Sequence, residues 1–233
     1  MTQPRGADAD PSNGDTLSER AASLLQRDIL AGHLAPGARL GIVELAQRYE
    51  IGATPLREGL SRLVSRGLIV AIGQRGFRVA AVSEDDLRDI TRIRTVVEVE
   101  ALRLAMTQGG DAWEAEVLAA LHRLRRNVER MGARFSEGSE EFDALHKGFH
   151  TALLAACGSP RLLAAHGDLY DQAYRYRRVM MHRIEEAREF VDSHRMLADR
   201  VLARDVAGAQ AMLADHLAST LQIVYPSQPG RPS

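Results

Sequence analysis

Residues 52–63 read GATPLREGLSRL, and this stretch decides the fold of the N-terminal part of the chain. Thr54 has a side chain that caps helices well, and Pro55 suits the first helical position. We therefore expect a helix from this threonine to about Ser65. A shorter helical pattern, Ile42–Tyr49, precedes it across a tight turn. Two helices joined in this way predict a helix-turn-helix.

Elements on both sides of this motif complete a winged helix. Upstream, Thr16 and Glu19 have the spacing of a capping box and start a helix. Downstream, residues 68–81 alternate between apolar and polar side chains around a glycine-rich turn, which predicts a β-hairpin. We therefore expect a winged helix-turn-helix over residues 16–81. The polar, acidic residues 1–15 are expected to form a disordered tail.

The candidate DNA contacts lie at the ends of these elements. A helix-turn-helix places the N-terminal end of its second helix in the major groove, and Thr54 and Arg57 lie at that end. Arg75, at the hairpin tip, is placed for the minor groove or the backbone. Arg62 and Arg66 lie further along the helix and either neutralise backbone phosphates or are solvated charges. Residues 36–80 contain seven arginines against three acids, a local charge of +4. The alternative is that Thr54 only caps the helix and that Arg57 is a surface arginine.

The second half of the sequence is expected to be all-α. Helical patterns without strand signals predict antiparallel helices at residues 83–108, 112–131, 140–156, 159–181, 184–202 and 206–224. Residues 132–139 are a predicted loop, and residues 225–233 a predicted flexible tail. The predicted fold class is therefore mostly α, a winged helix-turn-helix followed by an all-α antiparallel helical bundle over residues 83–224.

Four histidines in this half have a spacing that suits a metal site. His146 and His150 are four residues apart and share a helix face. His194 and His216 fall on two later helices whose separation fits antiparallel neighbours. Such a set can hold a divalent transition metal in a bundle core, and imidazole suits Zn, Ni, Co or Fe. The alternative is a chance spacing, because buried histidines are often only hydrogen-bonded.

The N-terminal motifs resemble a known family. Leu45-Ala46, Thr54-Pro55-Leu56-Arg57-Glu58 and Gly67-Leu68 are similar to the signature of the GntR family of bacterial regulators. The resemblance implies a homodimer whose two winged helices read a palindromic operator on double-stranded DNA. Many members carry Ser-Arg directly before the Thr-Pro pair, whereas this chain has Gly52-Ala53. In this feature it resembles the subgroup of carbon-starvation-induced regulators.

The C-terminal half resembles the FCD ligand-binding domain of the FadR-type GntR subgroup. The resemblance rests on Arg94-x3-Glu98, Phe149-His150, Gly158-Ser159-Pro160 and Met212-x3-His216-Leu217. It implies a metal held by one Asp and three His, in which His150, His194 and His216 match the histidines and His146 stands where the Asp is usual. It also implies that Arg94 clamps the carboxylate of an effector. Further effector-binding candidates are Tyr174, Arg175 and Arg178.

These patterns predict a ligand-responsive, DNA-binding transcriptional regulator, a repressor of a metabolic operon whose effector is a small organic acid. The chain is not expected to be an enzyme, because it has no His-Glu-x-x-His motif and no obvious general base beside the histidines. One alternative is a His-rich, metal-dependent hydrolase. Another is a helical scaffold that uses its winged helix for protein contacts.

The composition favours a cytoplasmic protein. No run of about 18 apolar residues is present that could span a membrane. The N-terminus lacks the apolar segment of a signal peptide. The single cysteine, Cys157, fits a reducing compartment.

Overall fold

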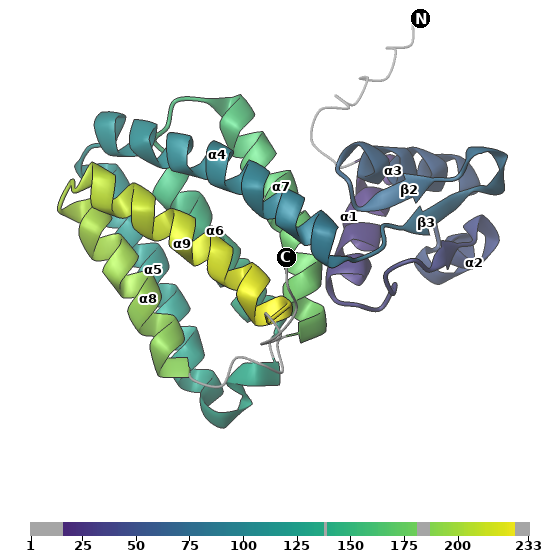
Figure 1. The fold of residues 1–233 in the computed structure, drawn as a ribbon. Coiled ribbons are helices and arrows are strands. Elements are labelled where there is room, and N and C mark those ends of the chain that lie inside the picture. The colour runs from purple at the N-terminus through teal and green to yellow at the C-terminus, as the bar shows by residue number, and fades with distance from the viewer. Residues whose placement is uncertain (1–15, 138, 181–186, 227–233) are drawn as a thin grey trace, which may run out of the picture.

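The computed structural model describes residues 16–137, 139–180 and 187–226, which form two parts (Figure 1). The N-terminal part contains α1 (Leu17–Leu30), β1 (Arg39–Leu40), α2 (Ile42–Tyr49), α3 (Ala53–Ser65), β2 (Ile69–Ala71) and β3 (Phe77–Val79). The C-terminal part contains α4 (Glu84–Gln108), α5 (Asp111–Met131), α6 (Glu140–Leu154), α7 (Pro160–Met180), α8 (Ala187–Leu202) and α9 (Val206–Val224). The predicted fold class is therefore confirmed. The predicted tail at residues 1–15, and residues 227–233 of the C-terminal tail, lie outside the described residues.

The wing is a three-stranded antiparallel sheet with the strand order β1-β3-β2. Ile69 on β2 pairs with Val79 on β3, and Leu40 on β1 pairs with Phe77 on the other edge of β3. The turn between β2 and β3 holds a short 3-10 helix, Gly73–Arg75. The hairpin was predicted, but β1 was not, because a strand of two residues carries too little alternation to be recognised.

The two long helices of the winged helix pack closely because Gly59 has no side chain. A Cβ at this position would lie 2.9 Å from the backbone nitrogen of Ala22 and 3.0 Å from Cβ of Ala21. The apolar side of α3 is fully buried and consists of Leu56, Leu60 and Leu63. This contact between α1 and α3 sets the direction of α3, and therefore the place of its N-terminal end.

α3 begins earlier than the sequence predicted. Its N-cap is Gly52, with extended backbone (φ −60°, ψ 158°), and the carbonyl of Gly52 accepts a hydrogen bond from the nitrogen of Leu56 at 3.2 Å. Thr54 therefore lies in the first turn, and its predicted role as the cap is wrong. Glycine reaches the N-cap conformation without a side-chain hydrogen bond. The side chain of Thr54 is consequently exposed at the end of the helix.

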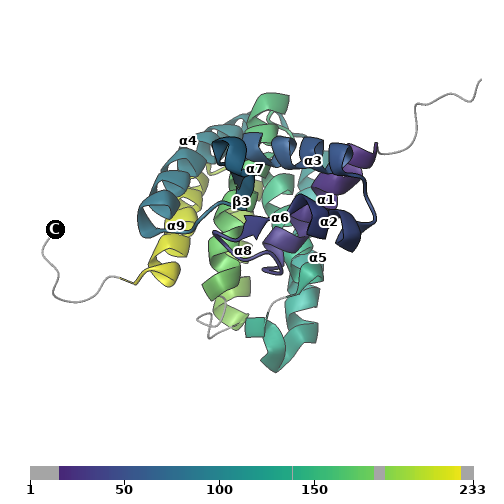
Figure 2. The ribbon, with the colours of Figure 1, turned by 90° about the vertical axis from the view of Figure 1, so that its right-hand side faces the viewer.

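The bundle is built around α4, the longest of the described helices. The hydroxyl of Ser83 caps α4 by accepting a hydrogen bond from the nitrogen of Asp86 at 3.2 Å. α4 packs against α7 and α9, whereas α5 packs against α6 and α8 (Figure 2). The predicted loop after α5 contains a 3-10 helix, Gly132–Glu137, because Phe135 is buried against Phe142 at a ring distance of 5.4 Å. None of the helices within the described ranges is long and apolar enough to cross a membrane.

Candidate functional site

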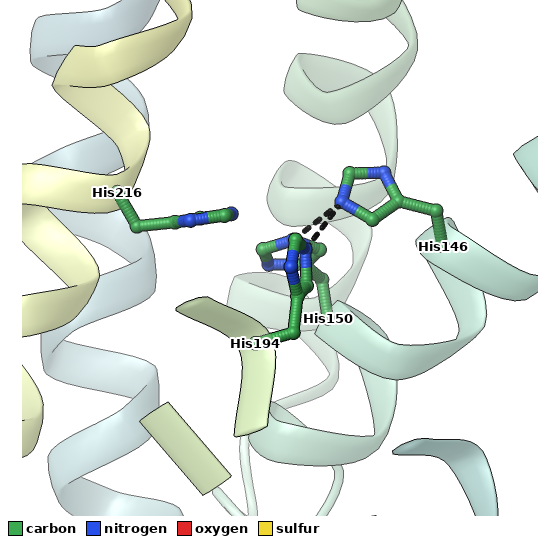
Figure 3. A group of neighbouring side chains, drawn as sticks. All are labelled: His146, His150, His194 and His216. Carbon is green, nitrogen blue, oxygen red and sulfur yellow. Dashed lines mark hydrogen bonds between the residues drawn. The ribbon is translucent and has the colours of Figure 1, made fainter. Parts of the chain in front are cut away.

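Four histidine side chains from three helices meet inside the bundle (Figure 3). His146 and His150 come from α6, His194 from α8 and His216 from α9. Nε2 of His146 lies 2.9 Å from Nε2 of His194 and 3.2 Å from Nε2 of His150. Each of the four offers one ring nitrogen, and these nitrogens lie within 4.8 Å of one another. The helical spacing that predicted the set thus corresponds to a real cluster, which we call the four-histidine cluster.

The ring orientations direct lone pairs toward the middle of this cluster. Nδ1 of His194 lies 2.6 Å from the carbonyl oxygen of Phe190, which can only accept, so Nδ1 carries the proton. Nε2 of His194 therefore presents a lone pair to its neighbours. Burial lowers the pKa of His150 well below its ordinary value of 6.5, and His216 and His194 lower it further. His150 is therefore a neutral ring, the form that binds metals.

The cluster fits a divalent cation by its chemistry. Nδ1 of His150 is buried and has no hydrogen-bond partner among the described residues. Three Nε2 atoms lie at hydrogen-bond distance, yet a neutral imidazole carries only one proton for its two nitrogens. A cation bound by the Nε2 atoms would satisfy these three nitrogens without extra protons. The donor set contains imidazole nitrogens and no carboxylate, since His146 occupies the position at which the resemblance implies Asp.

A small cavity adjoins the cluster. Its volume is about 20 Å³, room for little more than a water molecule. The charged and polar residues that line it are Arg94, His146, His150, Tyr170, Tyr174, His216 and Thr220. The structure therefore brings two of the predicted effector-binding residues, Arg94 and Tyr174, to the histidines.

Arg94 is the cation of this cavity. It is 6% exposed, and its Nε donates to Oε1 of Glu98 at 2.7 Å. Its two Nη groups make no hydrogen bond to another described residue, so they remain available to an anion in the cavity. Tyr174, on α7, lines the same cavity, and the Tyr174 hydroxyl donates to the carboxylate of Asp143. These groups are suited to binding a carboxylate.

The other two predicted effector residues are placed differently. Arg175 points away from the cavity, because its Nη1 donates to the carbonyl oxygen of Ala80 at 2.8 Å, at the junction with the winged helix. Arg178 lies in α7, but its side chain lies outside the described residues. Sequence reasoning missed Tyr170, whose hydroxyl lies 2.6 Å from Nδ1 of His146. Its position four residues before Tyr174, on the same helix face, was the available signal.

The four candidate DNA contacts are exposed side chains of the winged helix. Thr54 and Arg57 lie in the first turns of α3, and Arg75 lies in the turn between β2 and β3. Arg62 is also exposed and lies 3.4 Å from a carboxylate oxygen of Glu19.

Comparison with known proteins gives the family. The family model "Bacterial regulatory proteins, gntR family" matches residues 17–79, and the FCD domain model matches residues 89–219. The repressor GlaR of Escherichia coli K12 is 39% identical over 210 residues, which cover 88% of this chain and 94% of that protein. The regulator BphR of Paraburkholderia xenovorans is 37% identical over 221 residues, covering 94% and 90%.

A solved structure agrees with these matches. E. coli McbR/YncC superposes with a TM-score of 0.77 at 26% identity, over 91% of this chain and 98% of that one. The chain belongs to the GntR family of bacterial regulators. As a GntR protein with an FCD domain, it is a ligand-responsive, DNA-binding transcriptional regulator. The alternatives of a hydrolase and a scaffold are not supported.

Proposed function

We propose that this GntR regulator holds a divalent transition metal in the four-histidine cluster and senses a small organic acid beside it. The observation that supports this most is the convergence of one imidazole nitrogen from each of four histidines on α6, α8 and α9, three of them buried. All four candidate ligands are imidazole nitrogens, which suit Zn, Ni, Co or Fe better than the oxygen-preferring Mg or Ca. When bound, such a metal would supply positive charge and a coordination position for a carboxylate oxygen.

The effector would lie between the histidines and Arg94. The Nη groups of Arg94 are the matching donors for a carboxylate, and Tyr174 borders the same cavity. A cavity of about 20 Å³ is too small for an organic acid. Binding therefore requires its walls to move, and this movement is what a sensor domain can transmit.

On the DNA side, we propose a homodimer in the cytoplasm that represses by binding a palindromic operator. Thr54, Arg57 and Arg75 would contact the DNA from each copy, with Arg62 as a weaker contact to the backbone. The names of relatives such as GlaR, described as a repressor, favour repression.

The metal content of the full-length protein tests the proposed site. Mass spectrometry is expected to find about one transition-metal ion per chain, removable by chelation. His194→Ala should lose it, whereas His122→Ala should keep it, because His122 is exposed on α5 and outside the cluster. Equal metal content in the two variants, or no metal in the wild-type protein after incubation with zinc, would reject the metal site.

A further inference from the structure

Tyr170 and Asp171 are consecutive residues of α7, and both contact α6. Tyr170 contacts His146 of the four-histidine cluster, and Asp171 contacts the next residue of α6, Lys147. The hydroxyl of Tyr170 lies 2.6 Å from Nδ1 of His146. Oδ1 of Asp171, a residue only 2% exposed, accepts a hydrogen bond from Nζ of Lys147 at 2.6 Å. Because Lys147 follows His146 on α6, two short bonds side by side join α6 to α7 at the edge of the cluster.

The other oxygen of Asp171 holds the winged helix. Oδ2 accepts from Nε2 of Gln26 on α1 at 2.7 Å and from Nη2 of Arg66 at 3.3 Å. Nε of Arg66 donates to Asp168 at 2.6 Å, and its carbonyl accepts from Gln172 at 2.9 Å. Since Arg66 is the C-cap of α3, that end of the helix is fastened to α7.

We propose that the Tyr170–Asp171 pair transmits occupancy of the four-histidine cluster to the winged helix. This inference rests on the proposed metal function.

The proton on His146 gives the first step of this connection. Nε2 of His194 presents a lone pair, so the 2.9 Å contact requires His146 to donate from its own Nε2. With the proton on Nε2, Nδ1 of His146 accepts from the Tyr170 hydroxyl. A metal held by Nε2 of His146 would leave Nδ1 to carry the ring proton, and Nδ1 would then donate to the Tyr170 hydroxyl.

The second step is mechanical. The cluster draws its ligands from α6, α8 and α9, and none from the described part of α7. A metal bound to His146 would hold α6 in place, and with it Lys147, the partner of Asp171. Asp171 then keeps a fixed position as the acceptor for Gln26 and Arg66. Occupancy of the cluster therefore favours the docked winged helix over an undocked one.

The test uses zinc alone on the full-length, chelator-treated protein. Calorimetry measures binding, and hydrogen exchange measures docking in peptides that cover residues 24–30 and 63–68. In the wild-type protein, zinc should slow exchange in both peptides by about fivefold or more. Tyr170→Phe should bind zinc about tenfold more weakly and, at saturating zinc, lose most of the slowing.

The matched pair of variants lies on α7. Asp171→Asn should bind zinc but show no zinc-dependent slowing. Asp168→Asn also removes a partner of Arg66, but no contact to α6, and should keep the slowing. Zinc binding without slowing in the wild-type protein, or full slowing in Asp171→Asn, would overturn the transmission and leave the metal site standing. Calorimetry that detects no zinc binding would overturn both.

Discussion

At the scale of single residues, Arg94 illustrates how a charge lies in a bundle core and stays available to a ligand. Its Nε is bound by Glu98, which also lies 3.2 Å from Nδ1 of His166. Burial raises the pKa of Glu98, but Arg94 and His166 lower it by more, so the net pKa lies below its ordinary range. The ionised carboxylate therefore holds the guanidinium in a fixed position beside the cavity.

Replacing this carboxylate should destabilise the fold. Glu98→Gln leaves Arg94 buried without its counter-charge, and we expect a loss of about 3 kcal/mol in the free energy of unfolding at pH 7, measured with urea. A depressed carboxyl pKa adds stability that is present above the ordinary value of 4.5 and is lost as the pH falls through the lower folded value. The difference between wild type and variant should therefore shrink below about pH 4.5. A difference that stays constant with pH would contradict this account.

The clearest DNA prediction also concerns one residue. Arg57→Ala removes an exposed guanidinium near the N-terminal end of α3. Binding to an operator selected from a random DNA library should weaken by about 1–3 kcal/mol. Arg123→Ala is the control, because it removes the same charge from an exposed position on α5 in the bundle. Fluorescence anisotropy that finds equal losses for both variants would remove Arg57 from the interface.

At the scale of elements, the contact between α1 and α3 depends on Gly59. A methyl group there meets the backbone of Ala22, which cannot move aside as a flexible side chain can. Gly59→Ala gains about 1 kcal/mol in helix propensity but overpacks the contact, and we expect a net loss of about 1–2 kcal/mol. Thermal unfolding should show a lower Tm. Gly148→Ala on α6 meets no atom within 4 Å and should instead raise the Tm, so a rise in both variants would contradict the prediction.

The long helices were predictable from the sequence because each buries an apolar stripe at helical spacing. The structure begins α5 one residue before the predicted start and ends it at the predicted Met131. The features that were missed depend on contacts between distant segments. β1 exists because Leu40 pairs with Phe77, and the 3-10 helix after α5 exists because Phe135 packs against other aromatic rings.

The candidate site, like the fold, was predictable from the sequence only in part. The four histidines were found because two share a helix face and two lie on neighbouring helices, which are regular patterns. Tyr170 and Asp171 were not found from the sequence, because their importance comes from hydrogen bonds to distant residues. Tyr170 bonds to His146, 24 residues away, and Asp171 bonds to Gln26, 145 residues away. Without a spatial arrangement, an aspartate in the middle of a helix is not distinguishable from a surface charge.

At the scale of the whole molecule, Arg66 belongs to the junction between the two parts. The sequence suggested that it neutralises phosphates or is a solvated charge, but its guanidinium is bound to Asp168, Asp171 and Gln26. We therefore expect Arg66→Ala to leave the salt dependence of DNA binding unchanged, whereas removal of a true phosphate contact lowers the slope of log K against log salt by about 1. Anisotropy titrations over a series of salt concentrations measure this slope. A slope reduced by about 1 in Arg66→Ala would return this residue to the DNA interface.

α3 is held at its C-terminal end by α7 and carries Arg57 near its opposite, exposed end. A helix of 13 residues is about 20 Å long, so it acts as a lever whose pivot is at Arg66. A rotation of about 5° at this pivot moves the far tip by about 2 Å, enough to separate a formed hydrogen bond from a broken one. The length of α3 therefore amplifies a small rotation at Arg66 into a larger displacement of Arg57. A small movement of α7 in the sensor domain can in this way decide whether the protein binds its operator.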